Sequence, residues 1–183
     1  MTVLVTGAAG FIGSHLCEFL LSNGFEVIGI DNFDDYYSRS FKESNLKAIA
    51  SKSHFKFYEL DIRNRDELFN LFEKTKPKKV AHLAAKAGLR HSIGKALLYI
   101  DYNVNGTINV FDASVRYKIE NIVFTSTSSV YGNSPKSSFK ENDKCDKPLA
   151  PYPASKRSCE LLAHSYHNLH GMNLTLLRLF SVY

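Results

Sequence analysis

The chain has 183 residues, of which 44% are hydrophobic and 22% charged, the ordinary composition of a globular domain. This length supports one hydrophobic core of substantial size. The net charge is +5, but the basic residues are scattered along the chain. We therefore expect a solvated surface and no nucleic-acid partner.

Membrane, secretory and metal-binding classes are also disfavoured. No apolar run approaches the roughly 18 residues of a membrane-spanning helix. The N-terminus enters a strand pattern without a basic leader, which favours a cytoplasmic protein. Three cysteines, Cys17, Cys145 and Cys159, have no C-x-x-C spacing. We expect buried thiols in a reducing compartment, with neither a disulfide nor a metal site.

Short apolar runs alternate with longer segments of helical periodicity. Strands are predicted at 3–6, 26–30, 55–60, 80–84, 122–126 and 174–179. Helices are predicted at about 12–22, 39–51, 65–75, 95–117 and 151–170. Because helical crossovers join parallel strands, this order predicts one α/β domain over residues 1–183. Its architecture would be a doubly wound parallel sheet of about six strands, with helices on both faces.

Helix-boundary signals and one long loop complete this outline. Helix 12–22 is followed by Asn23 and Gly24, a helix-stop signal. Helix 65–75 opens at Asn64, whose side chain can cap it, and stops before Pro77. The stretch 133–151 is polar and proline-containing. A loop of that length in a compact domain is usually functional or mobile.

Three glycines follow the first strand at a G-x-x-G-x-x-G spacing. Gly7 permits a tight turn, Gly10 lets backbone approach a diphosphate, and Gly13 lets the helix pack closely on the sheet. The helix start at Phe11 and Ile12 offers N–H groups and partial positive charge to phosphates. A plain turn is the alternative, but the strand and helix on either side favour dinucleotide binding.

Two strand ends supply candidate contacts to an adenosine group. Asp31, at the end of the second strand, can accept hydrogen bonds from a ribose and would repel a 2′-phosphate. Because Asn32 and no arginine follows it, NAD is favoured over NADP. Asp61 and Ile62 occupy the matching place after the third strand. Caps or turns are the alternative roles for both aspartates.

The candidate reacting groups lie after the fifth strand. Tyr152 and Lys156 are four residues apart at a helix start, hence on one face. A nearby ammonium stabilises a phenolate, so Tyr152 is a candidate acid or base, and Lys156 could also hold a nicotinamide ribose. Segment 125–132 presents hydroxyls, and one of them could hold a substrate oxygen. A Ser/Thr-rich strand exit bonded to its own backbone is the alternative.

These motifs, together with His-Leu-Ala-Ala at 82–85, Asn-Val-Asn-Gly-Thr at 103–107 and Val-Tyr-Gly at 130–132, resemble the extended short-chain dehydrogenase/reductase family. The resemblance covers the whole chain and is strongest to the sugar-nucleotide epimerase branch. It implies a Rossmann fold that binds NAD, with catalytic roles for Thr127, Tyr152 and Lys156. The residues added to the cofactor contacts named above are Leu83, Ala84, Ala85, Lys86, Asn103, Thr125, Tyr152 and Lys156. The expected substrate contacts are Arg90, Ser126, Thr127 and Ser128.

The same resemblance helps to choose a reaction. Related dehydratases carry Asp-Glu before Val-Tyr-Gly, and related decarboxylases carry Glu, whereas this chain has Ser128 and Ser129. The missing carboxylates favour 4-epimerisation. Segments 31–37 and 87–92 are most similar to UDP-glucuronate 4-epimerases, and Arg90 suits a sugar carboxylate, although a surface role is as plausible for it. Lys86 and His91 depart from the glutamine and tyrosine expected there.

Members of the family continue into a C-terminal substrate domain, which is absent from this sequence. We therefore expect a truncated chain that binds NAD but lacks turnover on a nucleotide sugar. A dehydratase or decarboxylase of the same family, or a non-catalytic NAD-binding module, remains an alternative. The resemblance also implies a homodimer through helices 95–117 and 151–170, although packing on the chain's own sheet would explain their apolar stripes equally well.

Overall fold

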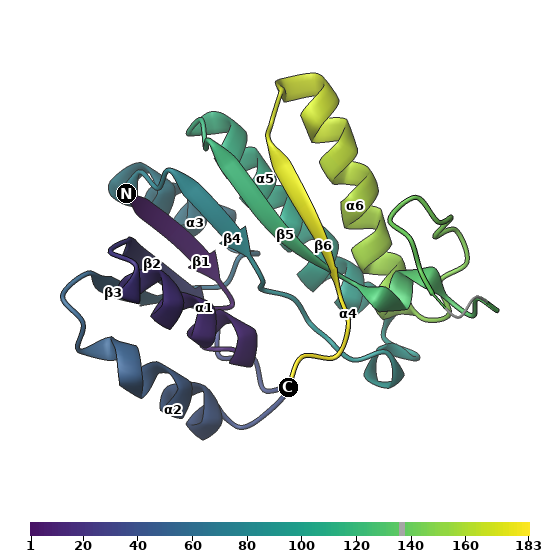
Figure 1. Cartoon of the computed structure of the whole chain (residues 1–183), viewed down its shortest axis with the longest axis horizontal. Helices are drawn as coiled ribbons and strands as arrows, with labels where there is room; N and C mark the ends of the chain where they lie inside the picture. The colour runs from purple at the N-terminus through teal and green to yellow at the C-terminus, as the bar shows by residue number, and fades with distance from the viewer. Residues whose placement is uncertain (136–137) are drawn as a thin grey trace.

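The computed structural model describes residues 1–135 and 138–183, and its centre is one parallel sheet. The strands are β1 (Thr2–Thr6), β2 (Glu26–Asp31), β3 (Phe55–Glu59), β4 (Lys79–His82), β5 (Asn121–Thr127) and β6 (Leu174–Leu179). They lie in the order β3-β2-β1-β4-β5-β6 (Figure 1). The predicted doubly wound, six-stranded sheet is confirmed.

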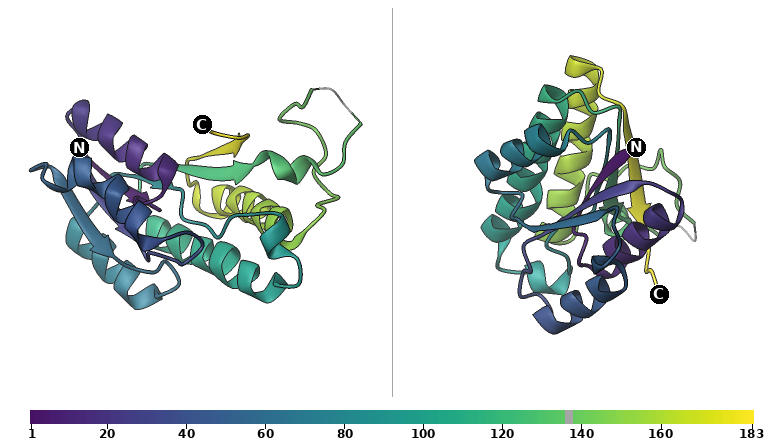
Figure 2. Two further views of the ribbon diagram at one scale, coloured as in Figure 1. Left: turned by 90° about the horizontal axis from the view of Figure 1, so that it is seen from below. Right: turned by 90° about the vertical axis from the view of Figure 1, so that its left-hand side faces the viewer.

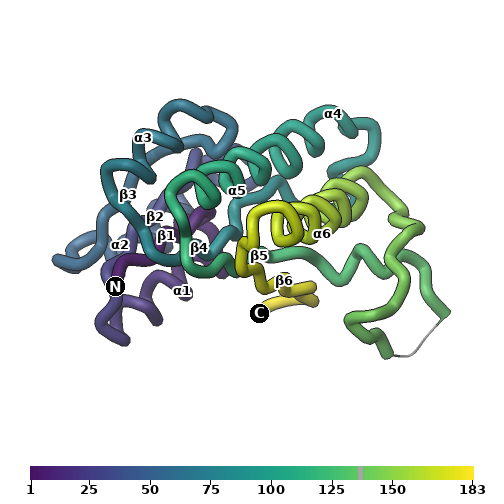
Figure 3. Tube along the Cα trace, turned by 90° about the horizontal axis from the view of Figure 1, so that it is seen from above, coloured from purple at the N-terminus to yellow at the C-terminus, as the bar shows by residue number. Residues whose placement is uncertain are grey.

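Helices cover the sheet from both sides. The longer helices are α1 (Phe11–Ser22), α2 (Arg39–Ala50), α3 (Arg65–Thr75), α5 (Gly106–Arg116) and α6 (Pro151–His170). Helices α1 and α2 lie on one face, and the row of α3, α5 and α6 lies on the other (Figures 2 and 3). Val5 packs with Cys17 and Leu46 in the first layer, whereas Leu4 packs with Phe72 in the second. Successive residues of β1 therefore face separate cores, as expected for a strand covered on both faces.

Strand β4 ends two residues earlier than predicted. The hydroxyl of Thr6 accepts hydrogen bonds from the backbone nitrogens of Leu83 (3.1 Å) and Ala84 (3.0 Å). Leu83 N also keeps a backbone bond to the carbonyl oxygen of Thr6 at 3.2 Å, whereas Ala84 N is bonded to the Thr6 side chain. The chain therefore leaves the sheet after His82 and enters the loop that the motif 82–85 marks.

The predicted helix 95–117 is divided into three parts. They are α4 (Ala96–Tyr99), a π-helical turn η2 (Ile100–Asn105) and α5. The wide turn carries Asn103, whose buried side chain accepts from Lys86 N (2.7 Å) and donates to Lys86 O (3.0 Å). A π-helical turn of this kind often marks a functional position, and here it holds the loop that follows β4.

Helix ends and cysteines agree with the sequence. The Asn64 side chain caps α3 by accepting from Glu67 N at 3.3 Å. Gly24 follows α1 with a φ of 79°. All three cysteines are buried and free. Within the described ranges, no helix combines the length and apolar character needed to cross a membrane.

Candidate active site

The predicted cofactor site lies where the strand order reverses. Strands β1 and β4 are neighbours, but the chain leaves β1 towards β2 and later crosses back to β4, so a crevice opens at their carboxyl ends. A cleft lined by the loops after β1, β2, β3 and β4 occupies this place. The predicted cofactor residues that line it are Gly7, Gly10, Asp31, Asn32, Asp61, Ile62, Leu83, Ala84, Ala85 and Lys86.

Gly7 and Gly13 of the glycine loop leave no room for a side chain. A Cβ at Gly13 would lie 2.0 Å from the carbonyl oxygen of Gly7, and a Cβ at Gly7 would lie 2.9 Å from Ala84 N. Gly10 precedes α1 without a side-chain cap. Bare backbone at the positive end of the α1 dipole can therefore approach a diphosphate closely. The loop fits NAD as the cofactor.

A tyrosine outside the motif contacts this helix start. The backbone N–H of Phe11 donates to the hydroxyl of Tyr37, which belongs to the loop after β2. Burial, and to a smaller extent the charge of Asp31, raises the pKa of Tyr37. A protonated hydroxyl that lines the cleft therefore stands beside the amides predicted to bind phosphate.

Asp31 is buried and is held by three donors. They are Ala9 N (3.3 Å), Phe33 N (2.9 Å) and the Lys42 ammonium (3.1 Å). Lys42 comes from α2, is itself buried and also lines the cleft. No sequence motif places a lysine at this point, so Lys42 was not predicted. The ion pair compensates the charge of Asp31, so repulsion of a 2′-phosphate by Asp31 is weaker than the sequence suggested.

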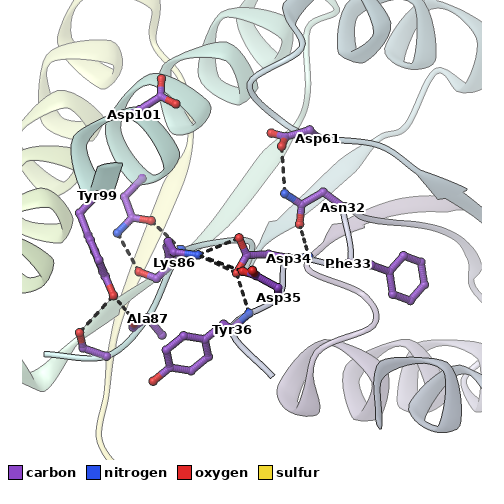
Figure 4. Close-up of polar contacts among 12 residues, drawn as sticks. Asn32, Phe33, Asp34, Asp35, Tyr36, Asp61, Lys86, Ala87, Tyr99 and Asp101 are labelled. Atoms are coloured by element: carbon purple, nitrogen blue, oxygen red, sulfur yellow. Dashed lines mark hydrogen bonds and ion pairs between the residues drawn. The ribbon is translucent and has the colours of Figure 1, made fainter. Parts of the chain in front are cut away.

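The loops after β2 and β4 meet across the cleft through a second ion pair (Figure 4). Lys86 Nζ lies 2.8 Å from both carboxylate oxygens of Asp34 and 4.0 Å from Asp35. Burial raises the pKa of Asp34, but the hydrogen bond and charge of Lys86 outweigh burial and hold this pKa below its usual value. Tyr102 places its ring centre 4.9 Å from the same ammonium. We call the ion pair between the Lys86 ammonium and the Asp34 carboxylate the Lys86–Asp34 pair.

Asp61 and Ile62 line the cleft at its predicted adenine end. Asp61 accepts from the guanidinium of Arg63 at 2.7 and 3.0 Å and from the side chain of Asn32 at 2.9 Å. Burial raises the pKa of Asp61, and the bonds from Arg63 reverse this effect. Ile62 is buried beside Gly106, where a Cβ would lie 2.6 Å from its side chain.

The predicted reacting groups meet at the carboxyl end of β5. The hydroxyl of Tyr152, in the first turn of α6, is hydrogen-bonded to Thr127, the last residue of β5. Lys156 lies one turn further along α6, fully buried, with Nζ 4.1 Å from the ring centre of Phe124. Burial lowers its pKa to about 8. Among the described residues, no carboxylate forms an ion pair with it.

The pKa of Tyr152 is raised, chiefly by burial. The hydrogen bond with Thr127 lowers this pKa, but burial outweighs it. Proton abstraction by Tyr152 therefore needs a positive charge that stabilises the phenolate. Stabilisation by Lys156 stays a prediction.

The hydroxyls of β5 point in different directions. Thr125 donates to the carbonyl of His82 at 3.2 Å. Ser126 lies on the opposite face, because side chains alternate along a strand, and its buried hydroxyl donates to Glu160 at 2.6 Å. Glu160 also accepts from Arg178 at 2.9 Å. The structure thus bonds Ser126 to the ion pair between Glu160 of α6 and Arg178 of β6, on the opposite face of β5 from Thr127.

The other two predicted substrate residues lie in short 3-10 turns. Ser128 begins η3 (Ser128–Tyr131), directly after Thr127. Arg90 begins η1 (Arg90–Ser92) and is exposed. The structure therefore brings Ser128 next to the reacting groups and leaves Arg90 on the surface.

These features define a dinucleotide-binding α/β domain with a candidate tyrosine–lysine site. Residues 3–183 match the model of the NAD dependent epimerase/dehydratase family, and the chain belongs to this family. It is 44% identical over 183 residues to the protein CapI of Staphylococcus aureus, covering 100% of this chain and 54% of CapI. It is 42% identical over 181 residues to a UDP-glucuronate 4-epimerase of Thermodesulfobacterium geofontis, covering 98% of this chain and 55% of that enzyme.

The fold of this chain is also similar to that of a solved 4-epimerase structure. The UDP-glucuronic acid 4-epimerase of Bacillus cereus, in complex with UDP-glucuronic acid and NAD, superposes with a TM-score of 0.93 at 39% identity. The match covers 100% of this chain and 57% of that one. The chain therefore spans about half the length of the relatives it matches.

Proposed function

We propose that this chain is the cofactor-binding part of an NAD-dependent sugar-nucleotide 4-epimerase that acts on UDP-glucuronate. The observation that carries the proposal is the Thr127–Tyr152 hydrogen bond, one helical turn from the buried ammonium of Lys156, which forms no ion pair among the described residues. The names of several relatives support the reaction and the substrate.

Each part of the site has a defined task. When bound, NAD would accept a hydride from C4 of the sugar and return it to the opposite face. Tyr152 takes the proton of the C4 hydroxyl and later returns it, while Thr127 holds the same oxygen. Lys156 holds the nicotinamide ribose, and its ammonium, one turn of α6 away from Tyr152, is the positive charge proposed to offset the burial of that phenol.

Cofactor binding uses the other end of the cleft. Gly10 and the start of α1 at Phe11 and Ile12, together with the Tyr37 hydroxyl that Phe11 N bonds, hold the diphosphate, and Asp31 accepts from the adenosine ribose. Lys42 shares this place, since it already contacts Asp31 at 3.1 Å. The remaining cofactor contacts come from the loop 83–86 and from Asp61 with Ile62.

The two residues that follow Thr127 favour epimerisation over elimination. A dehydratase needs an acid and a base beyond the tyrosine, but Ser128 and Ser129 carry no carboxylate. Ser129 N donates to the hydroxyl of Thr127 at 3.2 Å, so this turn orients Thr127.

The test is an assay of the full-length protein with UDP-glucuronate, UDP-glucose and UDP-N-acetylglucosamine, with the C4 configuration followed by NMR. We expect UDP-galacturonate to form from UDP-glucuronate, and Tyr152→Phe to lower kcat at least about 100-fold while retaining NAD. A 4-keto-6-deoxy product or a decarboxylated pentose would contradict the proposed reaction. Preference for UDP-glucose would contradict the proposed substrate.

The 183-residue chain has its own test. Calorimetry is expected to show NAD binding, and the NMR assay no epimerisation, because nucleotide-sugar contacts are expected outside this segment. Absence of NAD binding would contradict the first expectation, and turnover would contradict the second.

The homodimer stays a prediction. Leu97 on α4 and Leu161 and Leu169 on α6 are exposed, which supports a contact between copies through these helices. Sedimentation of the full-length protein and of a Leu161→Glu, Leu169→Glu variant tests it: a dimer that becomes a monomer is expected, and a monomeric wild type would contradict it.

A further inference from the structure

His82, at the end of β4, is fully buried and has no part in the chemistry proposed above. Its Nδ1 lies 2.7 Å from the hydroxyl of Thr6, and its Nε2 lies 3.0 Å from the hydroxyl of Thr107. Burial, helped by the charge of Lys156, lowers the pKa of His82 to about 3. The ring is therefore neutral, and one nitrogen donates while the other accepts.

The Thr6 hydroxyl determines which nitrogen carries the hydrogen. It already accepts from Leu83 N and Ala84 N, which occupies both of its lone pairs. Its own hydrogen must therefore be donated to Nδ1 of His82. A neutral ring whose Nδ1 accepts carries its hydrogen on Nε2 and donates it to Thr107.

The chain of bonds continues into α6 in the same direction. Thr107 is hydrogen-bonded to Cys159, and the Cys159 thiol donates to the carbonyl oxygen of Asn103 at 3.2 Å. Since Thr107 receives a hydrogen from His82, its own hydrogen is free for the sulfur of Cys159. Thr6, His82, Thr107, Cys159 and Asn103 are each at most 1% exposed. Water does not compete for these bonds.

Both ends of this chain hold parts of the proposed site. At one end, Thr6 binds the first two amides of the loop 83–86. At the other end, Asn103 accepts from Cys159 with its backbone carbonyl. The side-chain amide of the same residue binds both backbone groups of Lys86 and donates to Ser155 at 2.9 Å. Ser155 in turn donates to the carbonyl of Tyr152 at 2.7 Å.

We propose that His82, as a single neutral tautomer, is a positioning residue that couples the cofactor loop 83–86 to the catalytic helix α6. The proposal rests on the proposed function, in which loop 83–86 contacts NAD and α6 carries Tyr152 and Lys156. An apolar ring of the same size would fill the space among Phe111 and Phe124. Only a ring with an acceptor towards Thr6 and a donor towards Thr107 completes the chain.

Two substitutions in the full-length protein separate the halves of the chain. In His82→Asn, the side-chain oxygen lies near the place of Nδ1 and keeps the bond from Thr6. In His82→Gln, the amide nitrogen reaches the place of Nε2 and keeps the bond to Thr107. We expect His82→Asn to hold NAD within about threefold of wild type but to lose about tenfold in kcat. His82→Gln is expected to bind NAD about tenfold more weakly than wild type and to lose less kcat than His82→Asn. Tenfold is the effect typical of one buried hydrogen bond.

Further variants separate this role from packing alone. His82→Phe breaks both bonds and is expected to show both losses. Cys159→Ser keeps a group that can accept and donate, so its kcat is expected near wild type, whereas Cys159→Ala resembles His82→Asn. A merely structural role would lower Tm, kcat and NAD affinity in parallel in all the His82 variants. That result, or wild-type kinetics in His82→Phe, would overturn the proposal.

A failure of the proposed function can be distinguished from a failure of this inference. If the wild type epimerises no UDP-sugar, the proposed reaction is wrong, but the order of NAD affinities remains measurable. Weaker NAD binding in His82→Gln than in His82→Asn would then still support the coupling at the Thr6 end. Equal affinities would overturn it.

Discussion

The two ends of the cofactor cleft are built from different chemistry. At the adenosine end, the carboxylates that line the cleft are each paired with a cation: Asp31 with Lys42, Asp34 with Lys86, and Asp61 with Arg63. At the catalytic end, Thr127 and Tyr152 are neutral and the Lys156 ammonium lacks a carboxylate partner among the described residues. Charge is thus compensated where the cofactor is held and left uncompensated where the proposed reaction occurs.

Lys156→Met tests the uncompensated charge and has the largest expected effect. We expect kcat of the full-length protein to fall at least about 100-fold. The same change is expected to stabilise the 183-residue chain at pH 7 by roughly 1–3 kcal/mol, because an ammonium buried without a carboxylate partner disfavours folding. Urea unfolding measures this, and Lys47→Met on the exposed face of α2 is the control.

The difference in unfolding free energy between Lys156→Met and wild type should change with pH in one direction. The pKa of Lys156 is about 8 in the folded chain, below its ordinary value of 10.5. Between these values the unfolded chain binds the extra proton, so wild-type stability gains from Lys156 as pH rises. The advantage of Lys156→Met should therefore shrink from pH 8 towards pH 10. A variant less stable than wild type at pH 7 would contradict the comparison.

Gly13→Ala and Gly10→Ala probe the diphosphate region between the two ends. At Gly13 the new Cβ would lie 2.0 Å from the Gly7 carbonyl oxygen, so we expect a loss of about 3 kcal/mol or more in unfolding free energy. At Gly10 the nearest atom would be 3.1 Å away, so stability should change by less than about 1 kcal/mol. Gly10→Ala should instead weaken NAD binding about tenfold or more, because its methyl group stands where the diphosphate approaches. Calorimetry that finds unchanged NAD affinity in Gly10→Ala would contradict the phosphate assignment.

The contrast between the ends also explains what the sequence could predict. The glycine spacing and the Tyr152–Lys156 pair depend on local backbone geometry, so their placement beside β1 and β5 followed from the motifs. Lys42, Tyr37 and Asp34 were missed because their partners lie on other segments and only tertiary packing brings them together. The end of β4 at His82 was missed for the same reason, since the amides of Leu83 and Ala84 bond to the side chain of Thr6, which lies on another strand.

Burial of Tyr152 could not be read from the sequence either. The spacing correctly placed Tyr152 and Lys156 on one helix, but it carries no information about solvent. In the folded chain, burial raises the pKa of the phenol and lowers that of the ammonium. The sequence pattern therefore predicted which side chains come together, whereas packing in the folded chain determines their protonation state.

The Lys86–Asp34 pair tests compensation at the adenosine end. Lys86→Gln leaves the largely buried Asp34 carboxylate without its cation, and Asp34→Asn leaves Lys86 with only the exposed Asp35 at 4.0 Å. We expect each to cost roughly 1–3 kcal/mol of unfolding free energy. The double variant removes both charges and should lie within about 1 kcal/mol of wild type. Urea unfolding of the four proteins gives the coupling. Additive losses in the double variant would show that the two side chains act independently.

The smallest effect on unfolding free energy is expected from Arg39→Gln, at the first residue of α2. Arg39 bonds both oxygens of Glu59 at 2.7 and 3.0 Å, distances like those of the Lys86–Asp34 pair. The Arg39 and Glu59 side chains, however, are 53% and 52% exposed, against 12% and 14% for Lys86 and Asp34. Water and salt screen the exposed pair, so no measurable change in the urea midpoint is expected at physiological ionic strength. A loss as large as that of Asp34→Asn would mean that bond geometry, and not burial, determines the strength of these pairs.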